Sequence, residues 1–258
     1  MPLSPIVNRK ITTWVYLPPG YDKSTERYPV IYLLHGQPGG WTDCYLSGRV
    51  EEMADKLISK GQMRPAILVA FDADGPKGPN DMTNFCNRVT DGYRAEDFIC
   101  NELVPYTDAN YRTLPDAKSR ALWGYSAGGF GALNLGLHHP GLWDIWASHA
   151  GYYQASDDAK TMTKILGPQE QNQALWNANS PLVTVKQLPA SEAKNLHVYM
   201  DASPKEEDYD GYLTMTSELE ARGVDADTIS RSKAHAWRVI TQNCRDSLLF
   251  INKNWAQE

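Results

Sequence analysis

The sequence predicts an α/β fold with a mainly parallel central sheet and helices on both faces. Short apolar runs rich in β-branched residues alternate with helical patterns along the whole chain. Several of these runs are apolar at every position, as expected of strands covered on both faces. The 258 residues are 42% hydrophobic and 22% charged, which suits one large domain over residues 1–258. We find no linker or internal repeat that would divide it.

Seven segments favour strands because they are short, apolar or β-branched, and bounded by turn residues. The first stops at Pro18-Pro19-Gly20, and the second runs into His35-Gly36-Gln37-Pro38-Gly39-Gly40. In chain order, the expected strands cover residues 11–17, 28–34, 66–71, 121–123, 145–148, 195–200 and 226–230.

Five segments favour helices. Gly61 is expected to end the first, Pro105 to interrupt the second, and the last is amphipathic. Residues 152–188 are the least regular long stretch, and a substrate rim and a plain surface crossover fit them equally well. In chain order, the expected helices cover about 49–60, 93–110, 130–137, 209–222 and 241–255.

Charge and composition argue against several classes of function. The net charge is −6 without a concentrated basic stripe, so neither nucleic acid nor an anionic membrane is an expected partner. No apolar run approaches the roughly 18 residues of a membrane span. Residues 1–10 lack the apolar core of a signal peptide. A cytoplasmic location and a secreted, processed form both stay open, as does the oligomeric state.

The cysteines predict no metal site, because they form neither a CxxC motif nor a metal-like pattern with histidine. One disulfide, with Cys86 and Cys100 as the nearest pair, and free buried thiols are both compatible with the spacing. The four cysteines are Cys44, Cys86, Cys100 and Cys244.

The segment Gly124-Tyr125-Ser126-Ala127-Gly128 is the most informative in the chain. An apolar strand pattern precedes it and a helical pattern follows it. A serine at the apex of such a strand–turn–helix is typical of the nucleophile elbow of α/β-hydrolases. Small neighbours let the helix begin beside the strand, and the helix N-terminus provides N–H groups and a positive dipole end. The motif therefore predicts Ser126 as a nucleophile.

In α/β-hydrolases the acid and then the histidine follow the serine along the chain. Among six histidines, only His235 lies beyond a plausible acid loop and near the C-terminus, and it is the predicted base. The acid is expected in the loop after the strand that ends at Met200. Spacing alone leaves it open among Asp201, Glu206, Glu207 and Asp208.

Acyl transfer also needs backbone N–H donors for the developing oxyanion, each worth about 3 kcal/mol. Ala127, directly after the nucleophile, is one expected donor. Gln37, in the loop after the second expected strand, is the other, although a Pro/Gly turn would need similar residues for conformational reasons alone.

Side chains that could line a substrate pocket come from loops expected at the same sheet edge. Aromatic residues there would suit an aryl or sugar-linked ester, and packing roles explain them equally well. These candidates are Trp41, Asp74, Asn84, Phe85, Tyr152 and Trp237.

With these residues placed, the chain resembles the esterase-D-like branch of α/β-hydrolases. That branch includes feruloyl and acetylxylan esterases, S-formylglutathione hydrolases and mycobacterial mycolyltransferases. Many relatives carry the acid in a segment like Asp-x-Gly-x-x-Asp, and this resemblance implies Glu206 as the acid. Two departures are Ala202-Ser203 in place of a glycine-containing turn, and Ala234 where glycine usually precedes the histidine. The resemblance spans nearly the whole chain and rests on residues 30–36, 102–106, 110–113, 124–129, 179–181 and 234–237.

The sequence thus predicts a serine carboxylesterase that forms an acyl-enzyme on Ser126, with Glu206 and His235 completing the triad and no cofactor. Aryl or carbohydrate-linked esters of the feruloyl or acetyl type are the expected substrates. The alternatives are an acyltransferase of the mycolyltransferase type and a thioesterase resembling S-formylglutathione hydrolase. A non-catalytic binding module is disfavoured, because candidates for all three triad members are present.

Overall fold

The computed structural model describes residues 1–231 and 236–255. Seven strands form one sheet in the order β1-β3-β2-β4-β5-β6-β7. β1 is antiparallel to β3, and every other pairing is parallel. The strands match the seven expected ones in order: β1 (Thr13–Tyr16), β2 (Val30–Leu34), β3 (Ile67–Phe71), β4 (Arg120–Tyr125), β5 (Ile145–His149), β6 (His197–Ala202) and β7 (Asp225–Ser230).

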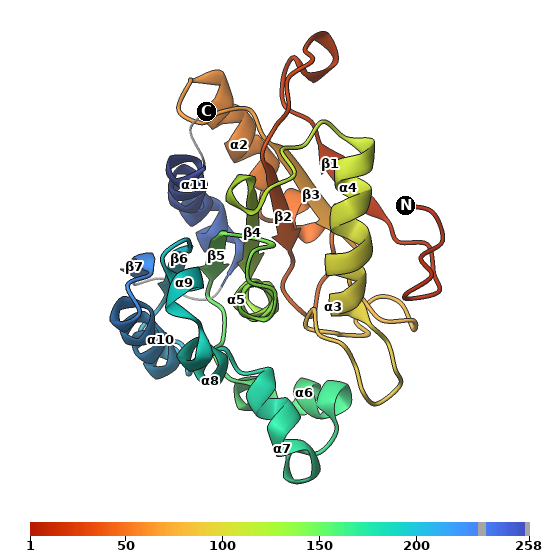
Figure 1. The fold of residues 1–258 in the computed structure, drawn as a ribbon, viewed down its shortest axis with the longest axis vertical. Coiled ribbons are helices and arrows are strands. Elements are labelled where there is room, and N and C mark those ends of the chain that lie inside the picture. The colour runs from red at the N-terminus through yellow and green to blue at the C-terminus, as the bar shows by residue number, and fades with distance from the viewer. Residues whose placement is uncertain (232–235, 256–258) are drawn as a thin grey trace.

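Helices cover both faces of this sheet, so the predicted α/β architecture is confirmed (Figure 1). The α-helices are α1 (Asp43–Leu46), α2 (Val50–Ser59), α3 (Ala95–Phe98), α4 (Val104–Asn110), α5 (Ala127–His138), α6 (Ala159–Leu166), α7 (Gln169–Ala178), α8 (Pro181–Thr184), α9 (Ala190–Ala193), α10 (Tyr209–Ala221) and α11 (Trp237–Asn254).

Alternation along the strands divides the core between the two faces. In β2, Ile31 and Leu33 pack with side chains of α2 and α11. The neighbouring residues Tyr32 and Leu34 pack on the opposite face with α3, α4 and α5. Because both faces are covered, every residue of β2 is buried, which explains its continuously apolar sequence.

Two expected helices differ in detail from the structure. The interruption expected near Pro105 is a π-helical turn, Ile99–Leu103, that joins α3 to α4. Pro105 itself is the second residue of α4, directly after this turn, within a helical run that continues from α3 to α4. A proline inside such a run removes one helical hydrogen bond, and the π-helical turn lies where the regular pattern is broken. α11 begins at Trp237, four residues before the expected start.

Residues 152–188, which we call the rim segment, are not irregular as the sequence suggested. They contain α6, α7 and α8, which lie together at the lower end of the molecule in Figure 1. Met162, Ile165 and Trp176 form a separate apolar cluster with Phe130 of α5. This packing stabilises helices whose many Gln and Asn residues conceal the apolar pattern.

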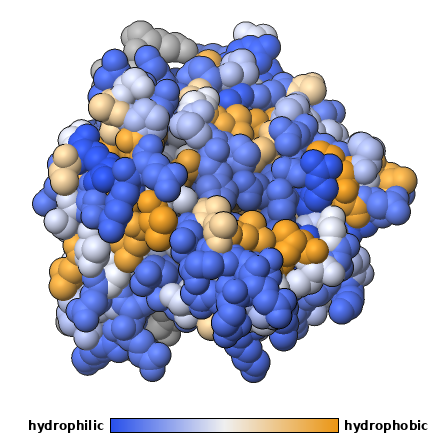
Figure 2. Space-filling model, turned by 60° about the horizontal axis from the view of Figure 1, so that its bottom comes forward, coloured by the Kyte–Doolittle hydropathy of each residue, from blue (hydrophilic) through white to orange (hydrophobic). Residues whose placement is uncertain are grey.

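The surface is mixed in character. Figure 2 shows one face on which hydrophobic side chains lie in patches separated by hydrophilic ones. Within residues 1–231 and 236–255, we find no helix with the length and apolar character needed to cross a membrane. All four cysteines are buried and free.

Two glycines, Gly124 and Gly128, allow α5 to begin in close contact with the sheet. A Cβ at Gly124 would lie 2.0 Å from the Gly128 carbonyl oxygen, and a Cβ at Gly128 would lie 2.0 Å from the Leu34 carbonyl oxygen. Both obstacles are backbone atoms that cannot rotate away. The two glycines therefore set the separation between β4, α5 and the end of β2.

We expect Gly128→Ala to lower the free energy of unfolding by about 3 kcal/mol or more, because the methyl group overpacks the contact with β2. Thermal and denaturant unfolding measure this effect. Gly40→Ala is the matched control, since nothing lies within 4 Å of a Cβ there, and it should change stability by less than about 1 kcal/mol. Equal stability of the two variants would contradict the steric argument.

Candidate active site

Ser126 lies between the last residue of β4 and the first residue of α5. Its backbone has φ 57° and ψ −120°, a region that L-amino acids rarely adopt and that costs roughly 1–3 kcal/mol. The Ser126 N–H donates to the His149 carbonyl oxygen at 2.9 Å, and the Phe130 N–H donates to the Ser126 carbonyl oxygen at 3.0 Å. The strained backbone is thus held from both sides, and the half-buried side chain stays accessible.

A cavity of about 590 Å³ opens beside Ser126. It joins the elbow to the start of the rim segment and to the loop after β6. It therefore brings Ser126 together with three of the four acid candidates. Its lining residues are Ser126, Ala150, Tyr152, Ser156, Asp157, Lys205, Glu206, Glu207 and Asp208.

Glu206 is held within this group by the turn after β6. Its Oε2 accepts the Ser203 N–H at 3.1 Å, and its own N–H donates to the Ser203 carbonyl oxygen at 2.9 Å. Burial, and then the nearby Glu206 carboxylate, raise the pKa of Tyr125 to about 12. The Glu206 carboxylate therefore lies within electrostatic reach of the residue that precedes Ser126.

Asp201 is engaged elsewhere. It is 2% exposed, and its Oδ2 lies 2.9 Å from His149 Nδ1 and 3.1 Å from Arg231 Nε. Burial raises the pKa of Asp201, but His149 and Arg231 outweigh this effect and hold it below the usual range. These contacts occupy the carboxylate inside the protein, and Asp201 is not among the described residues that line the cavity.

His149 also contacts Ser247, with 2.8 Å between Nε2 and Oγ. The resulting Ser–His–Asp arrangement is buried at all three residues. Trp123 Nε1 donates to the same Ser247 oxygen at 2.9 Å. Because all three residues are buried, a substrate cannot reach this group, and it is not a second catalytic site. Its hydrogen bonds instead link β5 and β6 to α11. The sequence analysis did not identify it, although His149 and Asp201 each directly follow an expected strand.

The predicted base, His235, lies outside the described residues. Arg231, four positions earlier in sequence, is firmly anchored. Its N–H donates to the Ala202 carbonyl oxygen at 2.8 Å, and its guanidinium lies 3.0 Å from Asp246 of α11. Arg231 is thus fixed beside the end of β6, the strand that leads to Glu206.

The loop after β2 approaches the elbow closely. A Cβ at Gly36 would lie 3.3 Å from the Tyr125 ring and 3.4 Å from the Ser126 Cβ. His35 is fully buried, its Nδ1 lies 2.9 Å from the Gly36 carbonyl oxygen, and burial lowers its pKa. His35 is therefore enclosed by protein at the start of this loop.

The two expected oxyanion donors lie on either side of this approach. Ala127 is the first residue of α5, and Gln37 follows Gly36. The Gln37 side chain is held at both amide atoms: Oε1 accepts the Asn84 N–H at 3.1 Å, and Nε2 donates to Asp74 Oδ1 at 3.4 Å.

Among the six expected pocket residues, Tyr152 lines the cavity beside Ser126. Its ring stacks on Phe130 with centroids 4.2 Å apart, and its hydroxyl accepts from Asn84 Nδ2 at 2.6 Å. Asp74 and Asn84 contact the Gln37 side chain. Ser156, Asp157 and Lys205 are cavity residues that the sequence analysis missed, although two of them belong to the rim segment.

The remaining three pocket candidates pack against protein. Phe85 is buried between the rings of His35 and Phe71, at centroid distances of 5.4 and 6.3 Å. Trp237 packs on the Tyr125 ring at 4.5 Å. Trp41 meets Trp14 edge to face at 6.1 Å.

A strained serine at the junction of a parallel strand and a helix, on a mainly parallel sheet, defines an α/β-hydrolase. The chain belongs to the putative esterase family, whose family model matches residues 4–238. The resemblance to this family inferred from the sequence is therefore confirmed.

Curated relatives include the endo-1,4-beta-xylanase/feruloyl esterase of Xylanibacter ruminicola, 34% identical over 148 residues, or 54% of this chain. Esterase Rv1288 of Mycobacterium tuberculosis is 34% identical over 140 residues, or 53% of this chain. The matches cover 19% and 28% of these two relatives, so the chain corresponds to only part of their length.

Solved structures share the fold over nearly the whole chain. A ferulic acid esterase has a TM-score of 0.84 and 24% identity, with 97% of this chain and 95% of that chain covered. An S-formylglutathione hydrolase from Agrobacterium tumefaciens has a TM-score of 0.79 and 17% identity, with 98% and 93% covered. MPT51 from Mycobacterium tuberculosis has a TM-score of 0.73 and 17% identity, with 98% and 96% covered.

Asp74 illustrates how burial at this site affects stability. Burial, and then the neighbouring Asp72 carboxylate, raise the pKa of Asp74 from 3.8 to about 6, against the opposing effects of the Asn80 backbone, Arg9 and Gln37. The folded state therefore binds this proton more tightly than the unfolded state. The ionised carboxylate destabilises the fold increasingly as pH rises from 3.8 to about 6, and fully above that.

We expect Asp74→Asn to raise the free energy of unfolding at about pH 7.5 by about 1–3 kcal/mol, and to have little effect near pH 4. Denaturant unfolding at the two pH values measures the difference. Asp227→Asn, at an exposed position of β7, is the control and should show no such difference. A shift in stability that is equal at both pH values would contradict the proposed cost of ionisation.

Proposed function

We propose that the protein is a serine carboxylesterase that acts through an acyl-enzyme on Ser126. The observation that carries this proposal is the strained Ser126 opening into a cavity that also holds Glu206. The backbone geometry presents the hydroxyl group at the start of α5, where helix N–H groups and the positive dipole end favour a developing negative charge.

In the proposed reaction, His235 accepts the Ser126 proton as the serine oxygen attacks the ester carbonyl carbon. Glu206 orients His235 and stabilises its protonated form. The N–H groups of Gln37 and Ala127 bind the oxyanion. The intermediate then collapses, the bond to the alcohol oxygen breaks, and His235 protonates that oxygen. Water, deprotonated by His235, attacks the acyl-enzyme to release the acid and restore Ser126.

The charged side chains that line the cavity favour a substrate with a polar, uncharged leaving group. Four carboxylate side chains line it with one ammonium group, so it disfavours an anionic substrate such as a glutathione thioester. Hydroxyl-rich carbohydrates can hydrogen-bond to such groups, and the Tyr152 ring offers an aromatic surface for an acyl group. The carboxylates and the ammonium group are those of Asp157, Glu206, Glu207, Asp208 and Lys205.

We therefore propose aryl or acetyl esters of carbohydrates as the substrate class. Similarity to a xylanase/feruloyl esterase and to a ferulic acid esterase supports this choice. Transfer of the acyl group to a carbohydrate hydroxyl, in place of water, would use the same residues, and the test below separates the two.

We expect wild-type protein to hydrolyse p-nitrophenyl acetate and methyl ferulate and to react with a fluorophosphonate probe. Ser126→Ala should lose probe labelling and at least about 10⁴-fold of kcat, because the nucleophile is absent. Circular dichroism checks that the variant is folded. Undiminished hydrolysis in the variant would sink the assignment. Labelling of wild type without hydrolysis, with acylated product appearing only when trehalose or a xylooligosaccharide is added, would identify a transferase.

Glu206→Gln should reduce kcat by about 10²–10⁴-fold, because an amide cannot stabilise the protonated histidine as a carboxylate does. The neighbouring substitutions Glu207→Gln and Asp208→Asn are matched controls in the same loop, and each should retain kcat within about tenfold. Steady-state hydrolysis of p-nitrophenyl acetate compares the three variants. A larger loss from either control than from Glu206→Gln would transfer the acid role to that residue.

A further inference from the structure

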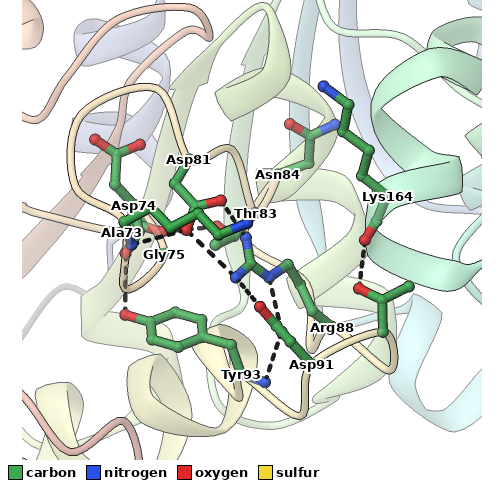
Figure 3. A network of polar contacts seen from close by, with 12 residues as sticks. Ala73, Asp74, Gly75, Asp81, Thr83, Asn84, Arg88, Asp91, Tyr93 and Lys164 are labelled. Carbon is green, nitrogen blue, oxygen red and sulfur yellow. Dashed lines mark hydrogen bonds and ion pairs between the residues drawn. The ribbon is translucent and has the colours of Figure 1, made fainter.

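Residues 72–94 connect β3 to α3 through more than twenty residues without a helix or strand of their own. Connections of this length in compact domains are uncommon, and they usually serve a function or are disordered. This one is ordered around Arg88, whose side chain is 6% exposed. Arg88 Nη1 donates to Asp81 Oδ1 at 2.6 Å, and Nε donates to Asp91 Oδ1 at 3.1 Å. Figure 3 shows Arg88 between these two carboxylates.

Further contacts hold residues 73–83 of this connection close to one another and to the region around Arg88. The Tyr93 hydroxyl donates to the Asp74 carbonyl oxygen at 2.9 Å, and the Tyr93 ring lies 5.3 Å from the Arg88 guanidinium carbon. Thr83 Oγ1 donates to the Ala73 carbonyl oxygen at 2.7 Å. A Cβ at Gly75 would lie 2.4 Å from Asp81 Oδ2. The segment is therefore tightly packed and internally cross-linked.

Two residues of this segment, Asp74 and Asn84, contact the Gln37 side chain. Asp74 accepts the Gln37 side-chain N–H, and the Asn84 backbone N–H donates to the Gln37 side-chain oxygen. Asn84 is fully buried and has φ 47°, a left-handed conformation that needs support from its surroundings. Its Nδ2 donates to Tyr152 on the cavity wall. Residues 72–94 thus contact both the loop that carries Gln37 and the wall of the cavity.

We propose that residues 72–94 form a rigid frame that positions the oxyanion hole, with Asp74 and Asn84 as positioning residues that act through Gln37. The two hydrogen bonds anchor the Gln37 side chain at both amide atoms. An anchored side chain restrains the Cα of Gln37, and thereby the direction of its backbone N–H. This inference rests on the proposed function, because it assigns the Gln37 N–H to the oxyanion.

A purely structural role does not explain the choice of residues. Asp74 is 5% exposed, and a carboxylate is costly to ionise at such a position. An amide or hydroxyl group would close the turn without that cost. A charged acceptor instead forms a stronger hydrogen bond with the Gln37 amide than a neutral one would. Retaining a destabilising group that orients a reacting site is typical of functional positions.

The test exploits the polarity of this contact. Gln37→Glu places a second carboxylate against Asp74 while leaving the backbone N–H in the sequence. We expect kcat for p-nitrophenyl acetate at about pH 8 to fall by about 10- to 100-fold with little change in KM, because the oxyanion donor is misdirected. Adding Asp74→Asn supplies a donor to the new carboxylate and should restore kcat to within about threefold of wild type.

Asp74→Asn alone replaces the charged acceptor of Gln37 by a neutral one, and it should lower kcat by about two- to tenfold with little change in KM. Asp227→Asn, at an exposed position of β7, is the matched control and should keep the wild-type kcat. Gln37→Met provides an independent variant that removes both side-chain hydrogen bonds without adding charge, and it should also lower kcat more than KM. Wild-type kcat in Gln37→Glu and Gln37→Met, or a double variant as slow as Gln37→Glu, would overturn the frame. In that event the proposed esterase function would still stand on the loss of turnover in Ser126→Ala.

Discussion

The close contact between α5 and the sheet is the constraint on which the site depends. Gly124 and Gly128 have no side chains, and the carbonyl oxygens of Gly128 and Leu34 occupy the space that a Cβ at each position would need. The chain must therefore reverse direction within one residue, which forces Ser126 into its positive-φ conformation. The first turn of α5, with N–H groups that have no partner within the helix, then begins beside the serine. The exposure of Ser126 and the polarity around it follow from this contact.

A buried polar network supports the strand ends below the serine. His149, the last residue of β5, is in register with Asp201, the next-to-last residue of β6. Arg231 and Ser247 link the two to the segment after β7 and to α11. Such buried pairs add little net stability, but removing one partner leaves an uncompensated group that costs about 3–5 kcal/mol. The network therefore contributes to a defined arrangement of the strand ends more than to a large gain in free energy.

The sequence predicted the features that depend on local pattern. Apolar runs identified the strands, and the glycine–serine motif identified the elbow, because each is encoded in a few consecutive residues. The helices of the rim segment were missed, since their apolar residues are widely spaced and gain their partners only in the folded protein. Spacing left four acids open, and burial of Asp201 distinguishes it from the other three. The contacts of Gln37 with Asp74 and Asn84 span 37 and 47 residues, and no local pattern encodes them.

The separate apolar cluster of the rim segment has a consequence for how this protein can diversify. Met162, Ile165 and Trp176 pack mainly among themselves and against Phe130 and Cys86, apart from the two clusters that flank the sheet. Exchanges between Ala155 and Trp176 can therefore be accommodated without repacking the sheet, whereas Tyr153, Leu182 and Val185 of the same segment pack in the cluster on the sheet. Two of the cavity residues, Ser156 and Asp157, belong to this segment. In the proposed esterase, substrate preference can accordingly evolve, or be engineered by grafting, separately from the proposed catalytic residues around Ser126.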